Sequence, residues 1–64
     1  MMEAFFADAI IRGDIGNVKV NIDTVYDMFV RRLGRVQADI SIARVKSILI
    51  AKGYPQLAKS NKKK

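Results

Sequence analysis

The sequence has no cysteine and no histidine among its 64 residues. Without cysteine the chain has neither a disulfide nor a thiolate metal site, and without histidine it lacks the usual general base and zinc ligand. The six carboxylates are scattered along the chain, and no glycine-rich phosphate loop of the P-loop type is present. We therefore predict that the protein is not an enzyme, has no catalytic residues, and binds no metal, cofactor or small-molecule substrate.

Long apolar runs are also missing. No run approaches the roughly 20 residues that cross a bilayer, and the longest, residues 47–51, lies between Lys46 and Lys52. The first eleven residues contain Glu3 and Asp8 and lead to no small-residue cleavage site, so we expect no secretory signal. We expect a cytoplasmic protein without membrane contact, associated with the nucleoid, or nuclear in a eukaryotic host.

Acidic residues are nearly absent from the second half of the chain. Residues 31–64 carry ten bases against the single acid Asp39, whereas residues 1–30 carry five acids and two bases. The two halves therefore have net charges of +9 and −3. Such segregated positive charge indicates a polyanion or an acidic protein surface as the partner.

The length of the chain restricts it to one small domain. A domain of this size buries only about 60% of the surface of its unfolded chain, so oligomerisation would help to stabilise it. Half of the residues are apolar, which favours a folded chain over a disordered one.

Hydrophobic periodicity predicts a first helix over residues 2–12, where apolar residues recur at i, i+3, i+4, i+7 and i+8. Glycines and turn-forming residues predict a loop over residues 13–17. Alternation of apolar and polar residues over 18–22 then predicts one short, half-buried strand.

A second helix has clear signals at both ends. Either Asn21 or Asp23 can cap its first backbone N–H groups. A 3.6-residue apolar period runs from there to Leu33, and Gly34 can take the left-handed conformation that ends a helix.

A third helix is predicted after a connection over residues 35–40. Asp39 or Ser41 would cap this helix, which would run to about Lys52 and end at Gly53. A helical wheel separates an apolar side from a small and basic outward side. The apolar side holds Ile42, Val45, Ile48 and Leu49, and the outward side holds Ala43, Arg44, Ser47 and Ala51.

The end of the chain has no apolar periodicity and finishes in three lysines. We therefore expect a helical domain over residues 1–57 and a disordered basic tail over residues 58–64.

The segment from Thr24 to Gly53 resembles the helix-turn-helix and winged-helix family of DNA-binding domains. In it, Arg-Arg-Leu-Gly closes one helix and Ser-Ile-Ala-Arg-Val-Lys-Ser-Ile-Leu opens the next. The resemblance implies a mainly α, three-helix, winged-helix-like domain that lacks the wing and has at most one short strand. It makes Leu33 and Gly34 the packed end of the supporting helix and Ser41 the cap of the recognition helix.

The same resemblance implies that Ala43, Arg44 and Ser47 face the major groove and that Lys46 faces phosphate. Physical arguments agree, because arginine can bond guanine through two hydrogen bonds, small residues allow close approach, and lysines release counterions from phosphate. We therefore predict a DNA-binding set that consists of Ala43, Arg44, Lys46, Ser47, Arg35, Lys59, Lys62, Lys63 and Lys64. Double-stranded RNA would use the same charges.

The chain carries more large apolar residues than a three-helix core of this size covers. Several fall outside the best apolar stripes, and we expect them at a homodimer or partner interface. The predicted interface residues are Phe6, Ile11, Met28 and Ile50.

Taken together, these features favour a sequence-specific, double-stranded DNA-binding regulator of transcription or replication, of a size that suits a virus, a plasmid or a microbial operon. Two alternatives stay open. One is a ribbon-helix-helix dimeric repressor, in which the strand pairs with its twin and Lys19 and Asn21 read the groove. The other is a small adaptor or inhibitor that binds an acidic protein surface.

Overall fold

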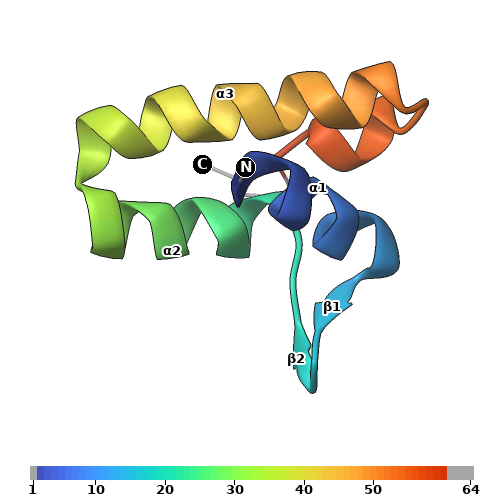
Figure 1. The fold of residues 1–64 in the computed structure, drawn as a ribbon, viewed down its shortest axis with the longest axis horizontal. Coiled ribbons are helices and arrows are strands. Elements are labelled where there is room, and N and C mark those ends of the chain that lie inside the picture. The colour runs from blue at the N-terminus through green and yellow to red at the C-terminus, as the bar shows by residue number, and fades with distance from the viewer. Residues whose placement is uncertain (1, 61–64) are drawn as a thin grey trace.

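The structure, a computed structural model, describes residues 2–60 and is mainly helical, as predicted (Figure 1). Among these residues, no helix is both long enough and apolar enough to pass through a bilayer. The elements in chain order are α1 (Met2–Arg12), β1 (Asp14–Ile15), β2 (Val18–Lys19), α2 (Ile22–Leu33), α3 (Arg35–Ala51) and the 3-10 helix η1 (Pro55–Ala58).

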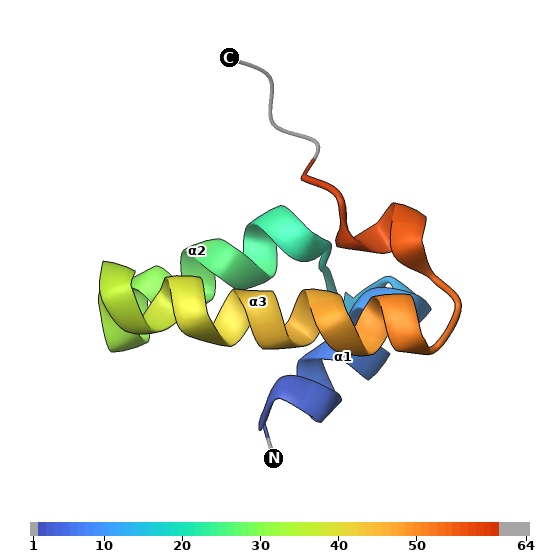
Figure 2. The ribbon, with the colours of Figure 1, turned by 90° about the horizontal axis from the view of Figure 1, so that it is seen from above.

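The longest helix, α3, organises the fold. Helices α2 and α3 run side by side in opposite directions, and α1 packs against α3 on its other side (Figures 1 and 2). The chain then turns back after α3, so that η1 packs on its C-terminal part. One face of α3 therefore lies on the rest of the molecule, and the opposite face is turned away from it (Figure 2).

The core lies between the three helices. Val25 of α2 and Val45 and Leu49 of α3 are its largest fully buried side chains. Phe29 of α2 contacts Phe6 of α1 edge to face, with ring centroids 5.1 Å apart. The predicted apolar side of the third helix is confirmed, because Ile42, Val45 and Leu49 are buried and Ile48 packs against them.

Helix α2 begins and ends where the sequence predicted. The Asn21 side chain accepts hydrogen bonds from the backbone N–H groups of Asp23 and Thr24, at 2.9 and 3.0 Å. The Thr24 hydroxyl in turn accepts from the Asn21 backbone N–H at 2.8 Å, which completes a capping box. Asn21, and not Asp23, is thus the cap, and Gly34 follows the last helical residue.

The predicted connection over residues 35–40 is wrong, because α3 begins at Arg35, directly after Gly34. Gly34 reverses the chain alone, with φ 83° and ψ 167°, a conformation that is essentially restricted to glycine. Ala38 is fully buried and extends the inner side of α3 toward its N-terminus. Asp39 and Ser41, the predicted caps, therefore lie within the helix.

The single-residue link makes α2 and α3 a helical hairpin (Figure 1). In the helix-turn-helix motif, by contrast, a turn of about three or four residues joins helices that cross at about 90–120°. The connection between α2 and α3 thus differs from that of the family which the sequence resembles.

Residues 14–19 of the predicted loop (13–17) and strand (18–22) form a small β-hairpin, and Ile22 already belongs to α2, although Val20 and Ile22 are buried as the alternation predicted. Strands β1 and β2 pair antiparallel, with Asp14 opposite Lys19 and Ile15 opposite Val18. Val18 is 65% exposed, so β2 is not the half-buried strand that was predicted. In the ribbon-helix-helix alternative, β2 would pair with its twin and Asn21 would read the groove; in this single chain β2 pairs with β1 and the Asn21 side chain caps α2.

The predicted tail begins within the packed structure. Ala58 belongs to η1 and is buried in the core. The Ser60 hydroxyl donates a hydrogen bond of 2.6 Å to the Asp23 carboxylate at the start of α2. Residues 61–64, the rest of the predicted tail, lie outside the described residues.

Candidate nucleic-acid interface

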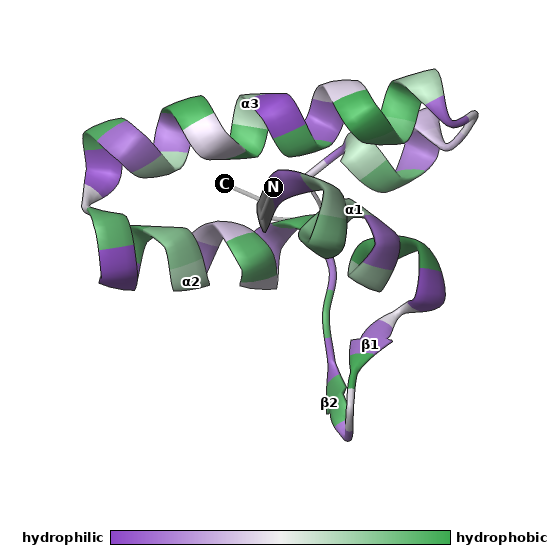
Figure 3. Cartoon of the chain, viewed as in Figure 1, coloured by the Kyte–Doolittle hydropathy of each residue, from purple (hydrophilic) through white to green (hydrophobic). Residues whose placement is uncertain are grey.

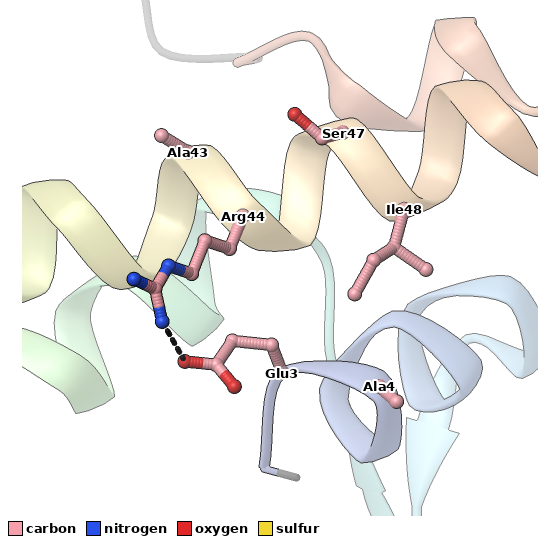
Figure 4. A pocket seen from close by; sticks show the side chains of 6 residues that line it. All are labelled: Glu3, Ala4, Ala43, Arg44, Ser47 and Ile48. Atoms are coloured by element: carbon pink, nitrogen blue, oxygen red, sulfur yellow. Dashed lines mark ion pairs between the residues drawn. The ribbon is translucent and has the colours of Figure 1, made fainter.

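Three of the predicted DNA-binding residues come together on the outward side of α3. Ala43, Arg44 and Ser47 are exposed and line a hollow of about 530 Å³ between α3 and the start of α1 (Figure 4). The complete lining consists of Glu3, Ala4, Ala43, Arg44, Ser47 and Ile48.

An acidic residue from α1 reaches this surface. The Glu3 carboxylate lies 3.9 Å from the Arg44 guanidinium, as the dashed line in Figure 4 shows. The Arg44 side chain is 61% exposed, whereas that of Glu3 is only 16% exposed. A carboxylate beside the predicted reading residue repels phosphate and offsets the positive charge of Arg44 at this surface.

Lys46 and Arg35 lie on another side of α3. Lys46 is half-buried and lines a second hollow, of about 260 Å³, together with Asp23, Asp39 and Tyr26. Two acidic residues therefore line the same hollow as Lys46, the predicted phosphate contact.

The same hollow contains a hydrogen bond between α2 and α3. The Tyr26 hydroxyl donates to the Asp39 carboxylate at 2.6 Å. This bond, with the negative charge of Asp39, raises the pKa of Tyr26 above its ordinary value, while the nearby Arg35 guanidinium acts in the opposite direction. Arg35, a predicted DNA contact, thus sits at the edge of a polar link between the two helices.

The remaining predicted contacts lie near the end of the chain. Lys59 is exposed immediately after η1. Lys62, Lys63 and Lys64 lie outside the described residues.

Charges that are separated along the sequence are mixed in space. Helix α1 from the acidic half packs against α3 from the basic half. Glu3 pairs with Arg44, and Asp8 lies 3.9 Å from Lys52. The folded surface therefore carries a smaller basic patch than the sequence alone indicates.

A cluster of arginines at the turn between α2 and α3 was not part of the predicted set, apart from Arg35. Arg31 and Arg32 lie in the last turn of α2, and Arg35 is the first residue of α3. All three side chains are exposed. We call these three residues the arginine corner. In the sequence they are three arginines within five residues. The predicted loop over 35–40 separated the second helix from the third, so it did not indicate that two helix ends meet at these arginines.

The backbone offers hydrogen-bond donors at the arginine corner. No side chain caps the N-terminus of α3, so its first backbone N–H groups are available to an anion. The positive end of the dipole of this 17-residue helix meets the negative end of the α2 dipole here, and Arg31 and Arg32 lie in the last turn of α2, where they offset that negative end. Helix N-termini of this kind bind phosphate groups.

The residues predicted at an interface have different environments. Phe6, Ile11 and Met28 are half-buried and pack against the core of their own chain. Ile50 is 56% exposed on α3.

Within residues 2–60, no three acidic, cysteine or histidine side chains gather as metal ligands would. No known family model, curated protein or solved structure matches this chain.

Proposed function

We propose that this chain is a small double-stranded DNA-binding protein, a regulator of transcription or replication, which holds the phosphate backbone through its arginine corner. The observation that carries the proposal is the exposure of Arg31, Arg32 and Arg35 around the uncapped N-terminus of α3. The location that goes with this partner is the cytoplasm, at the nucleoid, or the nucleus of a eukaryotic host.

The chemistry of the arginine corner suits phosphate. A guanidinium group is always charged and can donate two parallel hydrogen bonds to phosphate oxygens. Three such groups beside open backbone N–H donors can contact adjacent phosphates and release their counterions. Other bases offer less, because Arg44 and Lys52 lie beside carboxylates of α1.

Contacts with the backbone would dominate over base recognition. On the outward side of α3, Arg44 is the one exposed group between Val36 and Ile50 that can form a bidentate bond with guanine, and it is paired with Glu3. The role of Arg44 as a base-reading residue stays a prediction. Arg44→Ala should weaken binding to all duplex sequences alike if the residue contacts only phosphate.

Titration of labelled duplex DNA at about 50 and 200 mM salt tests the proposal, because binding through phosphate weakens steeply as salt rises. The decisive variant is Arg31→Ala/Arg32→Ala. We expect this variant to bind less tightly. The slope of the logarithm of its binding constant against the logarithm of the salt concentration should fall in magnitude by about 2, since each lost phosphate contact contributes about 0.9.

The matched control is Arg12→Ala/Lys52→Ala, which removes the same charge near the opposite end of α3 and should weaken binding less. Equal losses in the two double variants would mean that only net charge matters and would refute the arginine corner. Absence of binding even at the lower salt concentration would refute DNA as the partner. Competition by polyglutamate as strong as that by unlabelled DNA would also refute it and would favour an acidic protein surface.

A further inference from the structure

The outer face of α3 carries a mainly apolar stripe that faces away from the core of its own chain. Its members are exposed and follow one another at alternating spacings of four and three residues. They are Val36, Ile40, Ala43, Ser47 and Ile50. Spacing of this kind places side chains on the seam by which one helix packs against another.

The stripe is strongly exposed to solvent. Val36, Ile40 and Ile50 are 74%, 46% and 56% exposed. Seen from above, α3 lies in front of α1 and α2 along its whole length (Figure 2). Apolar residues recur along all of α3 (Figure 3), although its inner face alone supplies the core. A helix that is apolar on both sides is normally buried on both.

Side-chain size varies along the stripe. Val36 and Ile40 are large and lie toward the N-terminus of α3, Ala43 and Ser47 are small and border the hollow beside α1, and Ile50 is large again at the C-terminal end. The raised part at Val36 and Ile40 can fit the recessed part at Ala43 and Ser47 in an inverted copy of the stripe.

We propose that α3 pairs antiparallel with α3 of a second copy of this chain through the stripe, with Ile40 opposite Ala43 and Val36 opposite Ser47. Each large side chain then meets a small one, and the two-fold axis repeats both contacts. The inference does not depend on DNA binding.

The charges beside the stripe fit the same register. Asp39 and Lys46 flank it on one side, one heptad apart. Antiparallel pairing in this register brings Asp39 of each chain to Lys46 of the other, because like flanks of antiparallel helices meet. On the other flank, Arg44 meets Gln37, whose amide oxygen can accept its hydrogen bond.

Other registers fit less well. Shifting the antiparallel pair by one heptad in one direction places Lys46 against Lys46 and Arg44 against Arg44, and the opposite shift places Asp39 against Asp39. Parallel pairing in register places Ile40 against Ile40 while Ala43 faces Ala43, so the large residues hold the recessed parts apart. Charge and side-chain size together therefore favour antiparallel pairing with a second copy of the chain in the proposed register.

Sedimentation equilibrium over a range of protein concentrations tests for the dimer. The wild-type chain should associate to a dimer. Ile40→Glu should raise the dissociation constant by roughly tenfold or more, because it places a charge opposite Ala43. Val36→Glu serves as a second variant should Ile40→Glu lose its helical circular dichroism.

Val18→Glu is the matched control, because Val18 is an exposed aliphatic residue on the β-hairpin, with an exposure between those of Ile40 and Val36, and the dimer of this variant should be as stable as that of wild type. A wild-type chain that stays monomeric at all concentrations would overturn the proposal. A dimer that survives both α3 variants would overturn it as well, because another face would then be responsible.

Engineered cysteines test the direction of pairing, since the chain has none of its own. A mixture of Val36→Cys and Ser47→Cys chains should form mixed disulfide dimers upon oxidation. Neither variant alone should do so, because eleven residues of helix separate like positions by about 16 Å, beyond the roughly 7 Å that a disulfide spans. Efficient crosslinking of either variant alone would overturn the antiparallel register.

Discussion

Arg44 of α3 and Glu3 of α1 lie 3.9 Å apart, so the strongest base-reading candidate of the sequence is paired with an acid from the opposite half of the chain. The pair forms because α1 packs along α3. It decreases the positive charge on the outer side of α3, and it makes the arginine corner the more accessible basic site.

Glu3→Gln should strengthen binding to duplex DNA several-fold more than Asp14→Asn, which removes the same charge on the exposed β-hairpin. The reason is that Glu3→Gln also releases Arg44 from its ion pair. Folding stability should fall by less than about 1 kcal/mol, because the charged groups are 3.9 Å apart and Arg44 is largely exposed, so solvent screens the pair. Fluorescence anisotropy and urea unfolding measure the two effects, and equal affinities for the two variants would show that Arg44 does not contact DNA.

Gly34→Ala should lower the free energy of unfolding by roughly 1–3 kcal/mol, the cost of this backbone conformation for a residue with a side chain. A Cβ at Gly34 would meet no atom within 4 Å, so the cost is conformational and not steric. Chemical synthesis of the chain allows D-alanine at this position as the control. D-Alanine favours positive φ and should recover the stability, and a chain that remains destabilised would contradict this explanation.

Leu49→Ala should destabilise the protein by about 2–5 kcal/mol, because Leu49 is fully buried and its truncation leaves a cavity. Each kcal/mol lowers the melting temperature of a domain of this size by about 4–8 °C. The neighbouring Ile50 points outward, so Ile50→Ala should change stability by less than about 0.5 kcal/mol at low protein concentration. Thermal unfolding followed by circular dichroism compares the two variants, and similar losses would contradict the observed orientation of α3.

The hydrogen bond of the Tyr26 hydroxyl should make the free energy of unfolding depend on pH in the alkaline range. The pKa of Tyr26 is raised above 10.0, chiefly by the hydrogen bond to Asp39, so the protonated phenol is favoured in the folded state. The stabilisation is complete below pH 10 and is lost as the pH rises through the folded-state pKa. Urea unfolding at several pH values should therefore show an advantage of wild type over Tyr26→Phe that shrinks above pH 10. A constant difference would contradict the prediction.

Much of the local structure was predictable from the sequence. Helix α1 has the predicted bounds, and α2 ends at Gly34 as expected. The Asn21 cap and the Gly34 turn act on groups within a few residues of themselves, so their effects do not depend on distant parts of the chain. The inner side of α3 was likewise predictable from Ile42 to Leu49, because helical periodicity there is strong.

The start of α3 was not predictable in the same way. Val36 and Ile40 point outward, away from the core, and so they interrupt the apolar pattern by which a helix is recognised. The β-hairpin was missed because each strand has only two residues, too few to show a period. The predicted binding set included Lys46, yet tertiary packing makes this half-buried residue line one hollow with Asp23 and Asp39, which are distant in sequence or on another turn.

The sequence by itself determined three helices, the Asn21 cap and Gly34 end of α2, and an excess of positive charge, because these depend on residue type and on neighbours along the chain. Only the tertiary structure decided which charges remain accessible, because packing α1 against α3 brings Glu3 and Asp8 to Arg44 and Lys52. It also decided that Arg31, Arg32 and Arg35 meet at one corner, since Gly34 turns the chain within a single residue.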